Sequence, residues 1–170
     1  MNIERRFVKR RDWLLLTLLL LTAPGVAQEK HHSHHQSVCS APHPESMCNE
    51  STTCGSASTP CTVDVKRASD SAAAVASIAK PKANAPFCVK AGTKVTWQSL
   101  SKNTGFVIDF GTTSPFDPPG AAIGGSDRSV TVVAKKPGCF KYSAGACVSG
   151  ATYGMCDSVE GDVIVVGDSD

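Results

Sequence analysis

Short apolar runs separated by turn residues fill the chain from residue 61 onward. Val63 and Val65 alternate with polar residues, which places both on one face of a strand. Such β-prone runs lie at 62–66, 87–90, 94–99, 106–110, 129–134, 139–143 and 162–166. Short strands at this spacing, without a convincing amphipathic helix between them, are typical of antiparallel sandwiches. We therefore predict an all-β fold, an antiparallel β-sandwich over residues 61–170.

Two segments in this region are harder to assign. Residues 73–79 are rich in alanine, which suits a helix, but Val75 and Ile78 before Pro81 also suit an outer strand. Both assignments stay open. Residues 111–125 are rich in Gly and Pro, and we predict a long loop there.

The long loop carries an apolar residue, Phe116, among prolines that stiffen it. Loops at the ends of a sandwich often carry binding residues. Phe116 is therefore a candidate for a binding loop. The alternative is that its ring tucks into the core.

The first 27 residues have the parts of a secretory signal peptide. Basic residues come first, at Arg5, Arg6, Lys9, Arg10 and Arg11. An apolar run at 14–21 follows, and small residues precede a cut after Ala27. The apolar run is shorter than the ~20 residues of a membrane span, so we expect no span after cleavage. The Arg10-Arg11 pair also fits a twin-arginine signal, and either route predicts a periplasmic or secreted protein.

Removal of this peptide changes the charge of the chain. The full sequence has 17 Lys and Arg against 15 Asp and Glu. Residues 1–27 contain 5 of the basic and 2 of the acidic residues, which leaves 12 against 13 and a net charge of −1. Nothing in this balance indicates a nucleic acid or an anionic membrane as partner. A protein partner in the cell envelope or the extracellular space fits better.

Residues 28–60 differ from the rest, because they are polar and show no strand or helix period. We predict a disordered, His/Cys-rich tail. The cluster His31, His32, His34 and His35 either binds a transition metal such as Cu, Ni or Zn, or is a solvated segment with adventitious affinity. The tail cysteines are Cys39, Cys48, Cys54 and Cys61, and their gaps are too wide for a good zinc site. We expect up to two disulfides among these four.

Eight cysteines in a short exported chain indicate disulfides and an oxidising compartment. Cys147 and Cys156 lie nine residues apart in a glycine-rich segment, so they are candidates for a hairpin disulfide. Such a bond would stabilise the fold by about 3 kcal/mol. Cys88 and Cys139 would then pair with each other, and crossed pairing with the tail is the alternative.

Four segments match known strand patterns in order. Residues 87–97 are similar to "V-x-x-G-x-x-V-x-W", and residues 103–110 to the apolar strand that follows it. Residues 136–142 are similar to "P-G-x-Y-x-Y", and residues 161–166 to a closing "G-x-V-x-V" strand. Together they resemble the cupredoxin family of plastocyanin and azurin, over residues 70–167. The resemblance implies a Greek-key sandwich.

Cupredoxin copper sites need two His, a Cys thiolate and a weak axial Met. Cys147 and Met155 stand at the separation of the family's Cys-x2-His-x4-Met loop. Gly150 occupies the loop-His position, and residues 103–107 contain no His for the upstream position. A Cys147–Cys156 disulfide would also remove the thiolate. The resemblance thus predicts the fold without the type 1 copper centre.

Three functions follow from these patterns. The first is an exported, disulfide-stabilised binding or structural module without copper. The second is a metal-handling protein that uses the His-rich tail. The third is a blue-copper-like electron-transfer protein with non-standard ligands. We expect no enzyme, because no nucleophile constellation is found and Asp109, Asp117 and Asp127 read as solvated turn residues.

Overall fold

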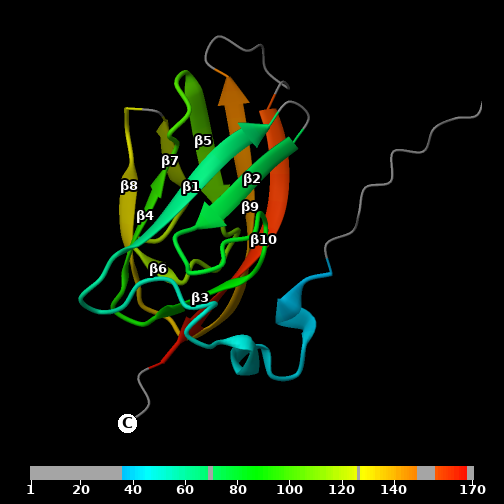
Figure 1. Cartoon of the computed structure of the whole chain (residues 1–170), viewed down its shortest axis with the longest axis vertical. Coiled ribbons are helices and arrows are strands. Elements are labelled where there is room, and N and C mark those ends of the chain that lie inside the picture. Colours follow the sequence, from blue (N-terminus) through cyan, green and yellow to red (C-terminus); the bar gives the residue numbers. More distant parts are fainter. Residues whose placement is uncertain (1–35, 69–70, 126, 149–155, 168–170) are drawn as a thin grey trace, which may run out of the picture. The chain divides into compact units, whose positions relative to one another are not determined.

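The computed structural model of the chain consists of two five-stranded β-sheets packed face to face (Figure 1). It describes residues 36–68, 71–125, 127–148 and 156–167. The strands are β1 Cys61–Ala68, β2 Ser71–Ala76, β3 Phe87–Lys90, β4 Lys94–Gln98, β5 Thr104–Asp109, β6 Phe116–Asp117, β7 Ala122–Gly125, β8 Val130–Ala134, β9 Gly138–Val148 and β10 Cys156–Val166. Two short 3-10 helices, η1 (Val38–Ser40) and η2 (Pro44–Met47), precede them. The predicted all-β sandwich is confirmed.

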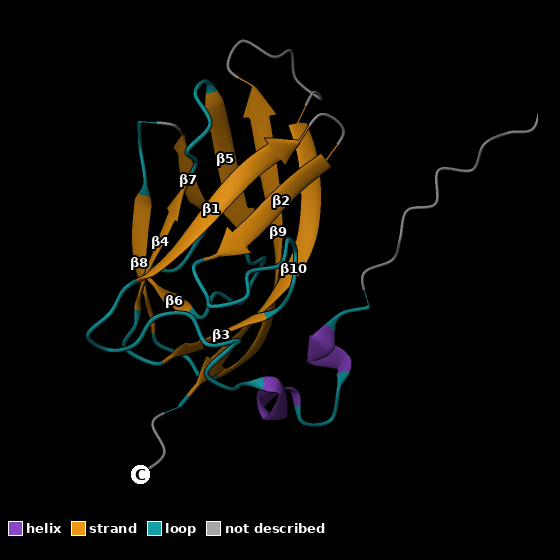
Figure 2. Cartoon of the chain, viewed as in Figure 1, coloured by secondary structure: helices purple, strands orange, loops and turns teal. Residues whose placement is uncertain are grey.

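The described ranges contain no helix long and apolar enough to cross a membrane. Figure 2 shows that strands dominate and that the two helical turns stand outside both sheets.

The sheets have the strand orders β2-β1-β4-β8-β6 and β3-β10-β9-β5-β7. Most neighbouring strands are antiparallel, but β1 runs parallel to β4, and β3 runs parallel to β10. The predicted antiparallel sandwich therefore contains two parallel pairs among its otherwise antiparallel neighbours. In both pairs other strands intervene in the sequence, as parallel neighbours require, because a hairpin turn cannot join them.

The alanine-rich segment is the edge strand β2, which pairs with β1 in antiparallel register. Ala72, Ala74 and Ala76 are buried, whereas the residues between them are half-buried. The burial thus follows the period of two of a strand, and the helical alternative is wrong.

The segment 111–125 contains two short strands, β6 and β7, in place of one long loop. Phe116 is only 4% exposed, and its ring centroid lies 5.1 Å from that of Phe110 and 6.5 Å from that of Trp97. The interpretation of Phe116 as a binding-loop residue is therefore wrong. Burial of a Phe side chain stabilises a fold by about 1.5–3 kcal/mol, which favours the core position.

Aromatic side chains fill the space between the sheets. Trp97 is fully buried, and the ring of Tyr142 lies 5.6 Å from it in an edge-on arrangement. Phe87 and Phe110 pack against the same pair of rings. These residues come from both sheets, so the cluster joins them.

The long strands β9 and β10 pair over ten residues and form the middle of their sheet. Along β9, Phe140, Tyr142, Ala144 and Ala146 are buried, and the residues between them are exposed or half-buried. The intervening residues therefore lie on the outer face of the sheet. This outer face holds the features described below.

Residues 37–53, which we call the strap, lie against the outer face at the Cys139 end of β9. Three disulfides are described, Cys39–Cys139, Cys48–Cys88 and Cys54–Cys61. Two of them join the strap to β9 and β3. The structure thus differs from the prediction of a disordered tail for residues 36–60, and the disulfide-linked unit begins before residue 61.

The predicted Cys88–Cys139 disulfide is wrong, and the strand register gives the reason. Ile164 on β10 pairs with Cys88 on one side and with Cys139 on the other. Two strand spacings of ~4.8 Å separate the cysteines, about 10 Å in all. A disulfide requires Cα atoms about 4.4–6.8 Å apart. Each cysteine therefore pairs with the strap, which is the crossed pairing left open above.

Candidate functional site

The resemblance to cupredoxins would place a metal where β5 begins and β9 ends. There Gly105 pairs with Cys147, and Thr104 pairs with Val148. A hollow of about 370 Å³ lies at this point. Its lining consists of Asn103, Thr104, Gly105, Gly125, Asp127, Cys147 and Val148. None of these residues offers an imidazole.

Cys147 is disulfide-bonded, so its sulfur is not a thiolate. The backbone of Cys156 lies directly opposite it in the β9–β10 register. The side chain of Cys156, and all of Gly150 and Met155, lie outside the described residues. The Cys147–Cys156 bond therefore stays a prediction, although the register is compatible with it.

The histidines do not gather at this hollow in the described part of the chain. His31, His32, His34 and His35 lie outside the described residues. His43 is described, and its exposed ring lies 3.3 Å from Glu45. His43 belongs to residues 37–53, the strap, which is joined to the Cys139 end of β9. Cys147 lies eight residues further along β9, so at ~3.3 Å per residue Cys139 and Cys147 are about 26 Å apart.

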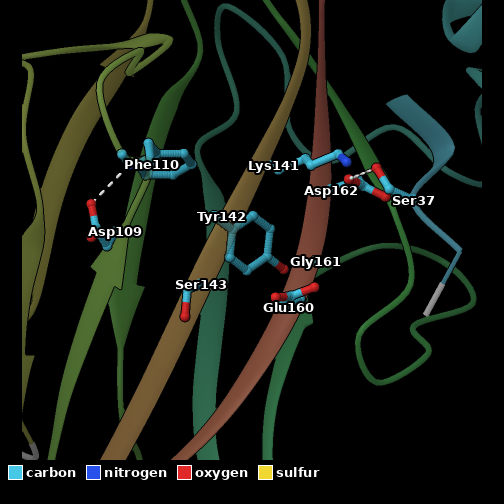
Figure 3. A pocket seen from close by; sticks show the side chains of 10 residues that line it. Ser37, Asp109, Phe110, Lys141, Tyr142, Ser143, Glu160, Gly161 and Asp162 are labelled. Atoms are coloured by element: carbon cyan, nitrogen blue, oxygen red, sulfur yellow. Dashed lines mark hydrogen bonds between the residues drawn. The ribbon is translucent and has the colours of Figure 1, made fainter. Parts of the chain in front are cut away.

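A second hollow, of about 440 Å³, lies on the outer face of the sheet beside the strap (Figure 3). We call it the β9 hollow. It is lined by Ser37, Asp109, Phe110, Gly111, Lys141, Tyr142, Ser143, Glu160, Gly161 and Asp162. In the register, Asp109 pairs with Ser143, and Ser143 pairs with Glu160. A small residue thus separates two carboxylates across three neighbouring strands.

Asp162 forms the boundary between the β9 hollow and the strap. Its carboxylate accepts hydrogen bonds from the Ser37 hydroxyl and the Val38 amide, each at 2.8 Å. The residue is only 2% exposed, although alternation along β10 places it on the outer face. The strap therefore covers Asp162 and supplies its hydrogen-bond donors. Figure 3 shows Ser37 directed at this carboxylate.

Tyr142 lies under the β9 hollow, with its ring in the aromatic core. Burial raises the pKa of its phenol well above the ordinary value, and the negative charge of Asp162 adds to this effect. Gly161 is its partner on β10, and a Cβ atom at that position would overlap the phenol ring. Within the described part of the chain the buried hydroxyl has no hydrogen-bond partner.

The free charges of the β9 hollow are mostly negative. Asp109 accepts a hydrogen bond from the Gly111 amide, at 2.8 Å. The ion pairs found among the described residues are His43–Glu45 and Lys66–Asp64, so neither Asp109, Glu160 nor Lys141 takes part in one. The hollow therefore presents two unpaired carboxylates and one ammonium group to solvent.

Sequence reasoning missed this second site. Asp109 read as a solvated turn residue, and neither Glu160 nor Asp162 stood out. The available signal was the alternation of polar residues in two neighbouring strands, with Lys141 and Ser143 on β9 and Glu160 and Asp162 on β10. Polar residues at every second position mark an outer face, but only the register places them side by side.

Comparison with known proteins adds no family to this description. No protein-family model matches the sequence, and a search of curated proteins finds no match either. The function must therefore be argued from the sites themselves.

Proposed function

We propose that the protein is an exported binding or structural module, a disulfide-stabilised cupredoxin-like sandwich without a type 1 copper site. The observation that carries the proposal is the disulfide-bonded state of Cys147. A sulfur held in a disulfide cannot act as the thiolate ligand that such a centre requires.

The histidine positions support the same proposal. Every histidine of the chain lies at or before His43. The strap carries His43 at the opposite end of β9 from Cys147. The two imidazoles of a type 1 centre therefore have no source within the sandwich itself.

The disulfides support export. Six cysteines form three described disulfides, and Cys147 is disulfide-bonded as well. Disulfides persist in oxidising compartments such as the periplasm and the extracellular space. We infer that the signal-peptide pattern of residues 1–27 directs the chain there, where the β9 hollow is available to a protein partner.

Peptide mapping of the purified, non-reduced protein tests the proposal. We expect a disulfide-linked peptide pair that contains Cys147 and Cys156, and no alkylation at either residue before reduction. Incubation with Cu²⁺ followed by desalting should leave no blue absorption band. One retained copper ion per chain with an intense blue colour, together with an alkylatable Cys147, would overturn the proposal.

A matched variant sharpens the copper test. Deletion of residues 28–35 removes His31, His32, His34 and His35 but none of the residues of the strap or of the strands. Loss of any colourless, weakly held copper in this variant would assign that copper to the tail. Blue copper that survives the deletion would point to Cys147 and contradict the proposal.

A further inference from the structure

The strap covers part of the sheet without contributing to the core. No side chain of η1 or η2 is buried, and Met47 is 47% exposed. Apolar burial is the dominant source of stability in a fold, and the strap contributes little of it. Its attachment must therefore depend on covalent bonds and a few hydrogen bonds.

The covered surface is the outer face near the start of β9. Val163 and Val165 belong to the core between the sheets, so Ile164 points outward, yet it is only 2% exposed. Contacts of η1 with β9 and of η2 with β9 and β10 place the strap over this face. Release of the strap would uncover Ile164.

Two disulfides and a small set of hydrogen bonds hold the strap in place. Cys39 and Cys139 are joined, and so are Cys48 and Cys88. Asp162 accepts the two hydrogen bonds from Ser37 and Val38 described above. The backbone of Cys88 makes two further hydrogen bonds. Its amide donates to the carbonyl of Thr52, and its carbonyl accepts from the amide of Cys54.

The three described disulfides differ in their access to solvent. Cys39 and Cys139 are both half-buried, so their bond has the most exposed pair of residues among the three described disulfides. Cys48 is half-buried, but its partner Cys88 is 1% exposed. Cys54 and Cys61 are both fully buried, which protects their bond. Thiol–disulfide exchange requires access of the attacking thiolate to a sulfur atom.

We propose that the strap is a cover released by thiol–disulfide exchange, in which Cys39–Cys139 opens first, Cys48–Cys88 second and Cys54–Cys61 last. A dithiol reductant attacks one sulfur of Cys39–Cys139 through its thiolate and forms a mixed disulfide, and the other cysteine leaves as a thiolate. The second thiol of the reductant then displaces the remaining cysteine. The reductant becomes a cyclic disulfide, and both cysteines are reduced by two electrons in total.

Release would change the β9 hollow as well as uncover Ile164. Ser37 forms one wall of this hollow and supplies a hydrogen bond to Asp162. Without the strap, the Asp162 carboxylate would face the same space as Asp109 and Glu160. The reduced protein would thus present a wider and more acidic surface, with thiols at Cys88 and Cys139 on either side of Ile164.

The experiment is a graded reduction of the full mature chain with dithiothreitol. Samples are alkylated at successive times, and mass spectrometry counts the modified cysteines of each disulfide. We expect Cys39–Cys139 to open at least tenfold faster than Cys54–Cys61, and near-ultraviolet circular dichroism to be retained at that point. Hydrogen exchange at the Val38 amide should accelerate at the same time.

A matched pair of variants tests the role of the carboxylate. Asp162→Asn removes the charge that holds Ser37 and Val38, and we expect several-fold faster opening of Cys39–Cys139 with unchanged opening of Cys54–Cys61. Asp127→Asn, at the other end of the sandwich, should leave all rates unchanged.

Two results would overturn the proposal. One is opening of all three disulfides at one common rate together with loss of near-ultraviolet circular dichroism, since reduction would then require global unfolding. The other is slow Val38 exchange after Cys39–Cys139 and Cys48–Cys88 have opened. Neither result bears on copper, so this test fails or succeeds independently of the proposed function.

Discussion

At one end of β9, Cys139 is joined to Cys39, which lies 100 positions earlier in the chain. At the other end, Cys147 lies opposite Cys156, nine positions later and on the next strand. The first end ties a remote segment to the sheet. The second end lies where two strands consecutive in the sequence, β9 and β10, pair with each other. Two cysteines on the same strand can therefore have different structural roles, and the residues around each cysteine decide which role it has.

The polar neighbours of the two ends differ in the same way. Beside Cys139, Asp162 is buried and accepts hydrogen bonds from two strap residues. Beside Cys147, Asp127 is exposed and lines an open hollow. The remote attachment is thus supported by both a covalent bond and a buried carboxylate, whereas the end of β9 at Cys147 has no buried carboxylate among the described residues that line its hollow.

The largest expected effect comes from loss of the remote disulfide. The chain-entropy model assigns about 4.7 kcal/mol to a closed loop of 100 residues. Because release of the strap also relieves its ordering cost, we expect the double variant Cys39→Ser, Cys139→Ser to lose about 3–4 kcal/mol of unfolding free energy. Urea denaturation, followed by circular dichroism, measures this loss.

The matched control is the double variant Cys147→Ser, Cys156→Ser. The stabilisation of about 3 kcal/mol given above for this short loop, less any strain in the bond, predicts a smaller loss of about 2.5 kcal/mol. It should leave exchange of the Val38 amide unchanged. A larger loss here than at Cys39 and Cys139 would break the proposed contrast between the ends.

Asp162→Asn should have the next largest effect. It replaces two charge-assisted hydrogen bonds with weaker ones, and we expect a loss of about 2 kcal/mol in unfolding free energy. Faster hydrogen exchange at the Val38 amide should accompany the loss. Asp127→Asn is the counterpart at the other end, and a change larger than about 0.5 kcal/mol there would contradict the contrast.

Tyr142→Phe should have the smallest effect and the opposite sign. The variant removes a buried hydroxyl that lacks a partner in the described structure, so we expect stability at neutral pH to rise by about 1 kcal/mol.

The same variant should change the dependence of stability on alkaline pH. The pKa of Tyr142 is raised in the folded state, so the unfolded chain ionises first and stability falls as pH rises above about 10. Tyr142→Phe should remove this part of the decline. The sequence has two tyrosines, and Tyr153→Phe is the control that should keep the decline. Equal alkaline losses in wild type and Tyr142→Phe would show that the buried phenol is not the cause.

Much of the fold could be predicted from the sequence. The alternation of Val63 and Val65 and the β-branched run at 162–166 predicted strands that the structure contains. The edge strand β2 stayed ambiguous, because alanine suits a helix as well as a tightly packed strand. Phe116 was ambiguous for a related reason, since an apolar residue among prolines does not reveal whether a core lies within reach.

The candidate site was less predictable. Asp109, Ser143 and Glu160 lie far apart in the sequence, and only the pairing of β5, β9 and β10 brings them into one row. The same holds for Asp162 and Ser37, which are separated by 125 positions. No local pattern encodes such contacts, because they depend on the register between strands.

The sequence by itself determined most of the strands, the presence of disulfides and the lack of imidazoles after His43. These properties depend on side-chain chemistry and on a period of two along the chain. Only the tertiary structure decided which cysteines pair, because Ile164 separates Cys88 from Cys139 by two strand spacings. Disulfide geometry acts over a few ångströms, and the distances between remote segments exist only once the sheets have formed.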